Sequence, residues 1–209
     1  MLKDWINQKH LKNISKLNKQ FNTNKPFPHL ELDLFKDSKI KQLLKEIKKL
    51  EFKEKDSDLF YLLQTVDFKS IKNKLINEFH SIISSKEFYN LLENITNIKG
   101  LGATDAASLI FPNTGYLLPH DDRLATRKIA YILNLSDFKD KDGGQLEFFE
   151  TDSNNNPIKV AKSITPKFNN FIIFKVSEKS FHQVSEVLSD KKRITIGGWF
   201  NEQYTPKSY

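Results

Sequence analysis

Cysteine is absent from this chain of 209 residues, which excludes a disulfide scaffold and any metal site built from thiolates. The absence also fits a reducing compartment. Long apolar runs are missing too, since no stretch approaches the roughly 20 residues that a membrane-spanning helix needs. The first residues, Met1–Trp5, open a charged amphipathic segment and not a signal peptide. We therefore expect a cytoplasmic protein without a membrane span.

Apolar side chains are nevertheless abundant enough for a core. Hydrophobic residues make up 38% of the chain and aromatic residues 12%, and the 17 phenylalanines outnumber tryptophan and tyrosine together. A chain of this length and composition can bury a substantial interior and fold alone as one domain.

The whole chain has a net charge of +7, and most of this excess positive charge lies in its first half. Residues 1–95 hold 18 basic against 13 acidic side chains, and residues 96–209 hold 15 against 13. Lysines such as Lys41, Lys45 and Lys48 would line the solvated face of a helix, where lysine is ordinarily found. Alternatively, they would attract RNA-bearing particles such as ribosomes by long-range steering. No direct nucleic-acid-binding motif accompanies them.

Periodicity and turn signals divide the chain into a helical first half and a β-rich second half. Helices are expected near 3–20, 37–50, 67–84 and 86–94, with a first strand at 30–35. Further strands are expected near 106–111, 116–121, 127–135, 145–149, 158–164, 171–176, 181–187 and 193–200. This order predicts an α+β fold: a double-stranded β-helix (jelly-roll) core with N-terminal helices packed on one sheet. Residues 1–99 would form the helical leader and residues 100–209 the catalytic core, within one structural domain.

A candidate metal site comes from two segments of this β half. His120 and Asp122 are separated by one residue, and His182 follows at the start of a later strand. Alternate side chains of a strand share a face, so His120 and Asp122 would point to one metal while Asp121 points away, toward a neighbouring backbone or Arg123. Two imidazoles and one carboxylate can hold Fe(II) and leave adjacent positions open. A His-x-Asp alone is more often structural, but strand signals surround this one.

A candidate anion site lies on the last strand. Arg193 and Thr195 share one strand face, and the intervening Ile194 and Ile196 predict that the strand is buried. A buried arginine needs an anion, and a planar guanidinium forks onto a carboxylate better than an ammonium does. Tyr116 and Trp199 have the inward parity of their strands, where an aromatic side chain either joins the core or lines a substrate pocket.

From about Thr104 to Phe200, the chain resembles the catalytic domain of the Fe(II)- and 2-oxoglutarate-dependent prolyl hydroxylases. It is most similar to the branch that hydroxylates a proline of a small-subunit ribosomal protein. The resemblance rests on Tyr116–Asp122, Arg127–Leu135, Asp142–Leu146 and Ser180–Val187, followed by Arg193 and Gly198–Phe200. Upstream, Pro26–Leu30 and Phe60–Thr65 are similar to the leader of the same branch.

The resemblance implies Fe(II) at His120, Asp122 and His182, with 2-oxoglutarate and O2 as cosubstrates and ascorbate as a further cofactor. Arg193 would bind the distal carboxylate of 2-oxoglutarate, with Thr195 beside it. Asn134 stands where eukaryotic relatives commonly have a tyrosine that contacts the cosubstrate. Those relatives also carry a second, non-catalytic barrel-like domain, for which 209 residues leave no room, so the resemblance is to a single-domain form.

The expected function is therefore hydroxylation of a prolyl residue in a protein substrate, with a small-subunit ribosomal protein as the candidate. Two alternatives stay open from the sequence. One is a hydroxylase of free proline or another metabolite. The other is a barrel without turnover, either a metal-binding jelly roll or a cupin-like sensor; the intact set of His120, Asp122, His182 and Arg193 argues against it.

Overall fold

The computed structural model describes residues 2–203. Its helices are α1 (Leu2–Trp5), α2 (Gln8–Leu11), α3 (Ile14–Thr23), α4 (Asp37–Ile47), α5 (Lys74–Ile83) and α6 (Lys86–Thr96), with short 3-10 turns η1 (Phe68–Ser70) and η2 (Asp140–Asp142). Its strands are β1 (His29–Leu32), β2 (Lys53–Ser57), β3 (Phe60–Gln64), β4 (Leu101–Phe111), β5 (Tyr116–His120), β6 (Arg127–Asn134), β7 (Leu146–Thr151), β8 (Pro157–Ile164), β9 (Phe171–Lys175), β10 (His182–Val184) and β11 (Arg193–Glu202).

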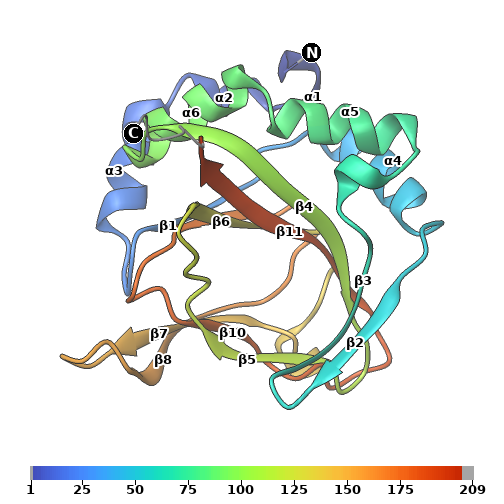
Figure 1. Ribbon diagram of the computed structural model, residues 1–209, viewed down its shortest axis with the longest axis vertical. Coiled ribbons are helices and arrows are strands. Elements are labelled where there is room, and N and C mark those ends of the chain that lie inside the picture. The colour runs from blue at the N-terminus through green and yellow to red at the C-terminus, as the bar shows by residue number, and fades with distance from the viewer. Residues whose placement is uncertain (1, 204–209) are drawn as a thin grey trace, which may run out of the picture.

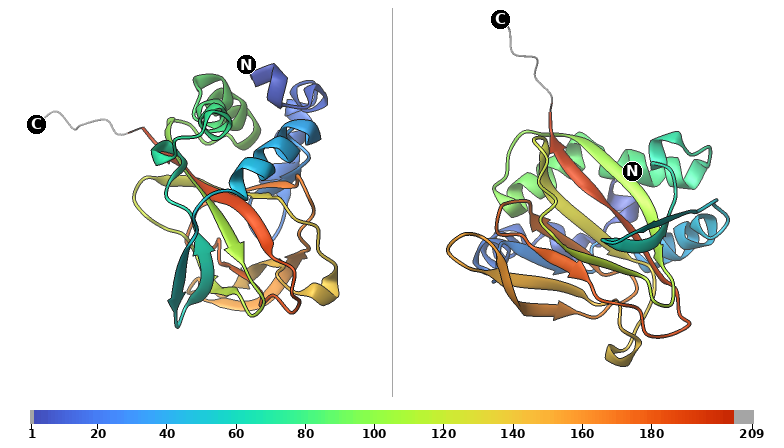
Figure 2. Two further views of the ribbon diagram at one scale, coloured as in Figure 1. Left: turned by 90° about the vertical axis from the view of Figure 1, so that its right-hand side faces the viewer. Right: turned by 60° about the horizontal axis from the view of Figure 1, so that its bottom comes forward.

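The strands wrap into a barrel-like sheet with two opposing walls. Strands β1, β9, β6, β11 and β4 form one wall in that order, and β5, β10, β7 and β8 form the other. Strand β3 joins the walls because it pairs with both β4 and β5. Figure 1 shows the walls one above the other, and Figure 2 shows their curvature from two further sides. The architecture confirms the expected α+β jelly roll with helices on one sheet.

The main core lies between the helices and the wall that contains β11 (Figure 1). Alternate residues of β11, Ile194, Ile196 and Phe200, pack with buried side chains of α4, α5 and α6. The residues between them, Arg193, Thr195 and Trp199, line the interior of the barrel instead. Period-two alternation thus gives β11 one apolar face for the helices and one mixed face for a site.

The first predicted helix is interrupted in the structure. Residues 3–20 were expected to form one helix, but α1, α2 and α3 are separate. Trp5 and Ile6 are both fully buried, and Ile6 forms a β-bridge with Phe35. The side chain of Asn7 donates to the carbonyl oxygens of Asp33 and Phe35, which fixes the break. The backbone N of Asn7 donates to the carbonyl oxygen of Leu34 at 2.9 Å and not to a carbonyl one helical turn earlier, so the chain leaves the helical path here.

Two strands of the first half were not predicted. All of β2 is exposed, so it lacks the alternation that marks a half-buried strand. Strand β3 pairs with β2 and continues the sheet into β4 and β5. Residues 1–99 therefore supply three strands to the sheet where the sequence indicated one, and the division of the chain at residue 99 stays a prediction. Within residues 2–203, no helix is both long and apolar enough to cross a bilayer.

Candidate metal centre

Two histidines from neighbouring strands face each other inside the barrel. His120 ends β5 and His182 begins β10, and the two are register partners whose ring centroids lie 4.2 Å apart. The Asp122 carboxylate joins them, with Oδ1 3.6 Å from His120 Nε2 and Oδ2 3.4 Å from His182 Nε2. One ligand atom of each residue lies within 4.8 Å of the others. This arrangement can hold one divalent metal ion and leave further coordination positions open.

Backbone carbonyls set the orientation of both imidazoles. The Nδ1 atom of His120 lies 2.8 Å from the carbonyl oxygen of Leu118, and Nδ1 of His182 lies 2.9 Å from that of Ser180. A carbonyl only accepts, so each Nδ1 donates and each Nε2 keeps its lone pair for a metal. Burial lowers the pKa of His182 to about 4, aided by His120 and opposed by Asp122. His182 is therefore neutral near pH 7, as a metal ligand must be.

Asp122 reaches the histidines by a route that strand alternation did not predict. Strand β5 ends at His120, and Asp122 lies beyond it with a φ of +64°. This left-handed conformation, which Asp tolerates better than most residues, turns the chain toward the barrel. The expectation for Asp121 is confirmed, because its carboxylate accepts from the backbone N of Arg123 at 3.1 Å and from its Nε at 2.7 Å.

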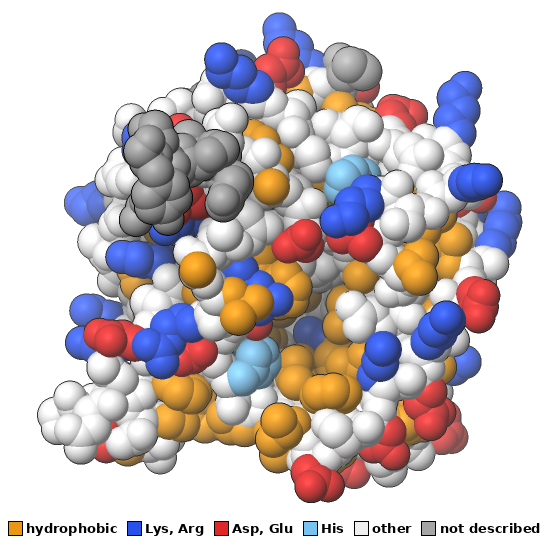
Figure 3. Space-filling model, in the orientation of Figure 1, with side chains coloured by type: hydrophobic (Ala, Val, Ile, Leu, Met, Phe, Trp, Pro, Cys, Tyr) orange, Lys and Arg blue, Asp and Glu red, His pale blue; other side chains and the backbone are white. Residues whose placement is uncertain are grey.

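His120, Asp122 and His182, called the metal group below, line a cavity of about 530 Å³. Arg193 lines the same cavity. The hollow is visible on the face shown in Figure 3. Arg193 is 1% exposed, and neither its Nε nor its Nη2 has a hydrogen-bond partner among the described residues. Burial lowers the pKa of Arg193 to about 9, and the guanidinium is still charged at neutral pH. A buried cation with free donors is costly unless an anion reaches it, so this end of the cavity fits a carboxylate.

Glycine makes room for this arginine. A Cβ at Gly144 would lie 3.2 Å from Arg193 Cδ, and Gly144 has a φ of +69°, where a side chain is strained. On another side, the guanidinium lies 5.0 Å from the centroid of the Phe111 ring. The arginine is thus enclosed by backbone and an aromatic ring, with its donors free.

Thr195 and Asn134 occupy different positions relative to the cavity. They are register partners on β11 and β6, and both are buried. Thr195 lines the cavity beside Arg193. Asn134 lies next to Thr195, outside the set of residues that line the cavity, and its Oδ1 has no partner in the part of the chain described. Contact between Asn134 and a cosubstrate stays a prediction.

The two aromatic candidates, Trp199 and Tyr116, also differ in position relative to the cavity. Trp199 lines the cavity, whereas Tyr116 belongs to a shallow depression with Asp56 and Tyr61, and its hydroxyl donates to the carbonyl of Ser57. The expectation that Tyr116 points inward is therefore wrong. His120 pairs with His182 but Leu117 pairs with Val184, so β5 uses one more residue than β10 over this interval. Because of this bulge, the residues of β5 before it that face the cavity are the odd-numbered ones. Leu117 therefore faces the cavity and Tyr116 faces away from it.

Sequence reasoning missed two contributions to the cavity. Phe60, Leu62 and Gln64 of the unpredicted β3 form part of its wall. The short apolar run at 60–63 was the available signal, though it does not alternate. Arg127 also lines the cavity and stacks on Trp199, with its Cζ 3.3 Å from the ring centroid. The scarcity of arginine, three residues in a lysine-rich chain, could have marked it.

Residues 107–201 match the family model of the 2OG-Fe(II) oxygenase superfamily. Prolyl 3-hydroxylase OGFOD1 of Xenopus laevis is 37% identical over 180 residues, covering 84% of this chain and 35% of that protein. Prolyl 3,4-dihydroxylase OGFOD1 of Ostreococcus tauri is 35% identical over 196 residues, covering 84% of this chain and 38% of that protein. The chain thus spans about a third of the length of these curated relatives.

A solved structure agrees with the barrel architecture. A prolyl-4-hydroxylase from Pseudomonas putida superposes with a TM-score of 0.73 at 14% identity, covering 90% of this chain and 100% of that one. At this identity the likeness concerns the fold alone. The matched family segment contains His120, Asp122, His182 and Arg193. Residues 107–201 thus form a domain of the 2OG-Fe(II) oxygenase superfamily, whose chemistry uses Fe(II), 2-oxoglutarate and O2.

Proposed function

We propose that this protein hydroxylates a prolyl residue of a protein substrate. The observation that carries the proposal is one cavity lined both by the His120, Asp122 and His182 group and by Arg193, a buried cation with free donors. Proline is the proposed target because the curated relatives that match most of this chain are named prolyl hydroxylases.

Each of these residues has a proposed role. Nε2 of His120, Nε2 of His182 and the Asp122 carboxylate would hold Fe(II). When bound, Fe(II) with 2-oxoglutarate and O2 supplies the oxidising chemistry that inserts one oxygen atom into a C–H bond, with succinate and carbon dioxide as coproducts. Arg193 would fork onto the distal carboxylate of 2-oxoglutarate, with Thr195 beside it and Asn134 on the neighbouring strand. The apolar cavity walls would exclude water from the reacting groups.

The surface beside the cavity favours a macromolecular substrate. Leu59 and Leu118 are adjacent in sequence to Phe60 and Leu117 of the cavity wall, Leu124 lies two residues after Asp122, and the three leucines are 62%, 41% and 62% exposed. Figure 3 shows hydrophobic side chains around the hollow. Exposed apolar patches of this kind mark interaction sites, because water solvates them poorly. Inside the cavity, Trp199 would offer a flat aromatic wall to the substrate.

Within this proposal, the target is a proline in an accessible loop of a small-subunit ribosomal protein. The resemblance of residues 180–187 and 198–200 to the ribosomal branch motivates this choice. The basic leader supports it, because Lys41 and Lys45 lie exposed on α4, Lys48 lies exposed directly after it, and all three would aid encounter with an RNA-bearing particle.

The test incubates the protein with Fe(II), 2-oxoglutarate, O2 and a panel of ribosomal peptides. Each peptide is paired with its proline-to-alanine version, free proline is included, and Asp122→Ala serves as the matched inactive enzyme. We expect succinate release coupled to a mass gain of one oxygen atom on a proline-bearing peptide. Succinate release with free proline or another metabolite alone would replace the protein substrate by a small molecule. Metal binding without any turnover would leave a non-catalytic barrel.

A further inference from the structure

We propose that Arg127 is a positioning residue that holds Asp122 in place for metal binding. This inference rests on the proposed function, since it assumes that Asp122 is a metal ligand. Arg127 begins β6, directly after the loop that carries Asp122. It contacts neither histidine in the described interactions, so its effect on the metal would act through Asp122.

Asp122 needs such support because the sheet does not provide it. Residues 121–126 between β5 and β6 contain neither helix nor strand, and Asp122 has a positive φ. His120 and His182, in contrast, are paired within the sheet. A carboxylate on an irregular loop would sample several orientations unless a contact restricts it, and that freedom would weaken a metal site.

Arg127 makes this contact from two directions. Its Nη1 donates to the backbone carbonyl of Asp122 at 3.2 Å and lies 3.7 Å from the Asp122 Oδ1. The guanidinium plane also packs on the Trp199 ring, with Cζ 3.3 Å from the ring centroid. Trp199 belongs to β11, which is paired on both sides. Arg127 thus ties the Asp122 loop to the most extensively paired strand of the wall.

The far end of the loop is held separately, because the carbonyl oxygen of Thr126 accepts from the backbone N of Glu202 at 2.7 Å. Beside Asp122, a contact from Ser180 is less direct. Ser180 Oγ lies 3.2 Å from the carbonyl oxygen of Asp121, but it lies 2.7 Å from the carbonyl oxygen of Ser177. A hydroxyl has one hydrogen, which favours the nearer acceptor. The Arg127 contact therefore carries more of the restraint on Asp122 than the Ser180 contact does.

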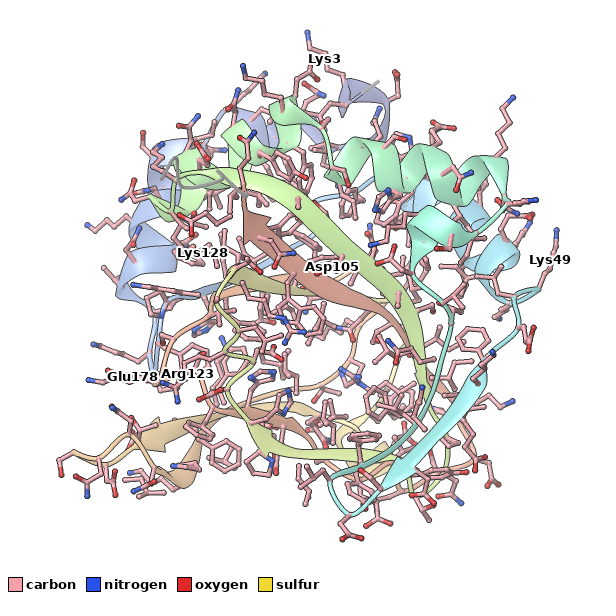
Figure 4. All side chains as sticks on the ribbon, in the orientation of Figure 1. Lys3, Lys49, Asp105, Arg123, Lys128 and Glu178 are labelled. Carbon is pink, nitrogen blue, oxygen red and sulfur yellow. The ribbon has the colours of Figure 1, made fainter. Side chains whose placement is uncertain are left out.

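The chemistry explains why this position holds arginine in a chain with only three arginines. A planar guanidinium can stack on a ring and donate in its plane at the same time, whereas an ammonium is a point charge that does not stack in this way. The same contacts argue against a role for Arg127 in binding the 2-oxoglutarate carboxylate. Lys128, labelled in Figure 4, is turned to Glu202 at 2.9 Å and does not serve that role either.

Arg123 offers a matched control from the same loop. It is labelled in Figure 4, has the same charge, and pairs with Asp121 while its side chain is 55% exposed. The Arg127 side chain is 20% exposed. Arg123→Gln removes one positive charge near the metal group without touching Asp122 or Trp199, so a difference between the two variants isolates the contact from the charge.

The experiment measures the dissociation constant for Mn(II) in metal-stripped wild-type protein and in Arg127→Gln, Arg127→Lys and Arg123→Gln. We expect Arg127→Gln to raise it by about 10- to 100-fold and Arg127→Lys to recover little. Arg123→Gln should stay within about threefold, as expected for an exposed ion pair. The apparent KM for 2-oxoglutarate at saturating metal should change little in any of the three. Thermal unfolding of the metal-free proteins provides the structural reference.

Three outcomes would overturn the inference. An unchanged Mn(II) dissociation constant in Arg127→Gln and Arg127→Lys would assign Arg127 a structural role at most, whatever happens to the unfolding temperature. Equal losses in Arg127→Gln and Arg123→Gln would show that net charge matters and the contact does not. Wild-type protein that binds no Mn(II) would instead contradict the proposed metal site itself, a failure distinguishable from the other two.

Discussion

The two polar parts of the cavity are held by different kinds of structure. Arg193 begins β11, a ten-residue strand whose partners are β4 and β6, and its guanidinium is enclosed by Phe111 and Gly144. The metal group depends on β10, a strand of three residues, and on a loop. The arginine is thus fixed by the sheet and by packing, whereas the metal group is fixed by individual hydrogen bonds: His120 to Leu118, His182 to Ser180, and Arg127 to the carbonyl oxygen of Asp122.

The different support of Arg193 and of the metal group indicates at which of them function and stability are coupled. A residue held by a few polar contacts at a cavity edge can be replaced with little loss of core packing. A charge buried inside the sheet affects both ligand binding and folding, because its desolvation is a cost that the folded protein bears until an anion binds. Substitutions at the metal end should therefore lower activity more than stability, and substitutions of Arg193 should change activity and stability together.

Loss of a metal ligand should give the largest effect and sharpen this contrast most. We expect His120→Ala, Asp122→Ala and His182→Ala each to abolish Fe(II)-dependent succinate production, since each would remove one of the three proposed metal ligands. The unfolding temperature should change least in His120→Ala, because His120 is partly exposed while His182 is buried. Turnover and thermal unfolding are measured side by side, with His80→Ala as a control outside the cavity. Turnover that survives in one of the three would remove that residue from the site.

Arg193→Ala should raise the apparent KM for 2-oxoglutarate by about 30- to 1,000-fold, equivalent to about 2 to 4 kcal/mol, because it removes a desolvated partner of a carboxylate. Arg193→Lys should recover only part of this loss, since an ammonium cannot fork onto the carboxylate. Steady-state kinetics across 2-oxoglutarate concentrations tests both variants, with the exposed Arg123→Ala as the control. An unchanged KM would mean that a different cation binds this carboxylate.

Arg193→Met should make the ligand-free protein more stable, by about 1 to 3 kcal/mol, because a thioether of similar length replaces a buried charge without a partner. Urea unfolding of the metal-free protein measures the effect. With Fe(II) present in both proteins, adding 2-oxoglutarate should stabilise the wild type more than this variant, which keeps the proposed metal ligands but lacks the cation for the distal carboxylate. A ligand-free variant that is less stable than the wild type would contradict the idea that the unpaired guanidinium destabilises the folded protein. It would also weaken the contrast between Arg193 and the metal group.

The smallest expected effect concerns acid stability at His29, which packs against Phe27 and Phe148 between the two walls. Burial lowers the pKa of His29 from its ordinary value of 6.5, opposed by the carbonyl of Phe27. The unfolded chain therefore binds more protons than the folded one just below pH 6.5, so stability is full above that pH and falls as the pH is lowered. His29→Phe should flatten this part of the pH dependence of the unfolding temperature. His80→Gln should leave it unchanged, and the same slope in both variants would exclude His29 as the cause.

Much of the barrel follows from local pattern. The eight strands expected from residue 106 onward all occur, because alternation and turn residues mark strands that have one buried face. Strand β2 lacked that signal since neither of its faces is covered. The interruption at Trp5 and Ile6 also depends on a partner, Phe35, that no helical periodicity reveals.

The sequence by itself determined which donors are available and in which strands most of them lie: two histidines and an arginine that strand alternation turns inward, and an aspartate two residues after the first histidine. Only the tertiary structure decided how Asp122 reaches the histidines, why Leu117 and not Tyr116 faces the cavity, and that Arg127 stacks on Trp199. Alternation is a property of one strand, so it can be read locally. A left-handed turn, a bulge and a stacked pair arise where strands distant in sequence meet, and their energies depend on contacts that form only when the barrel closes.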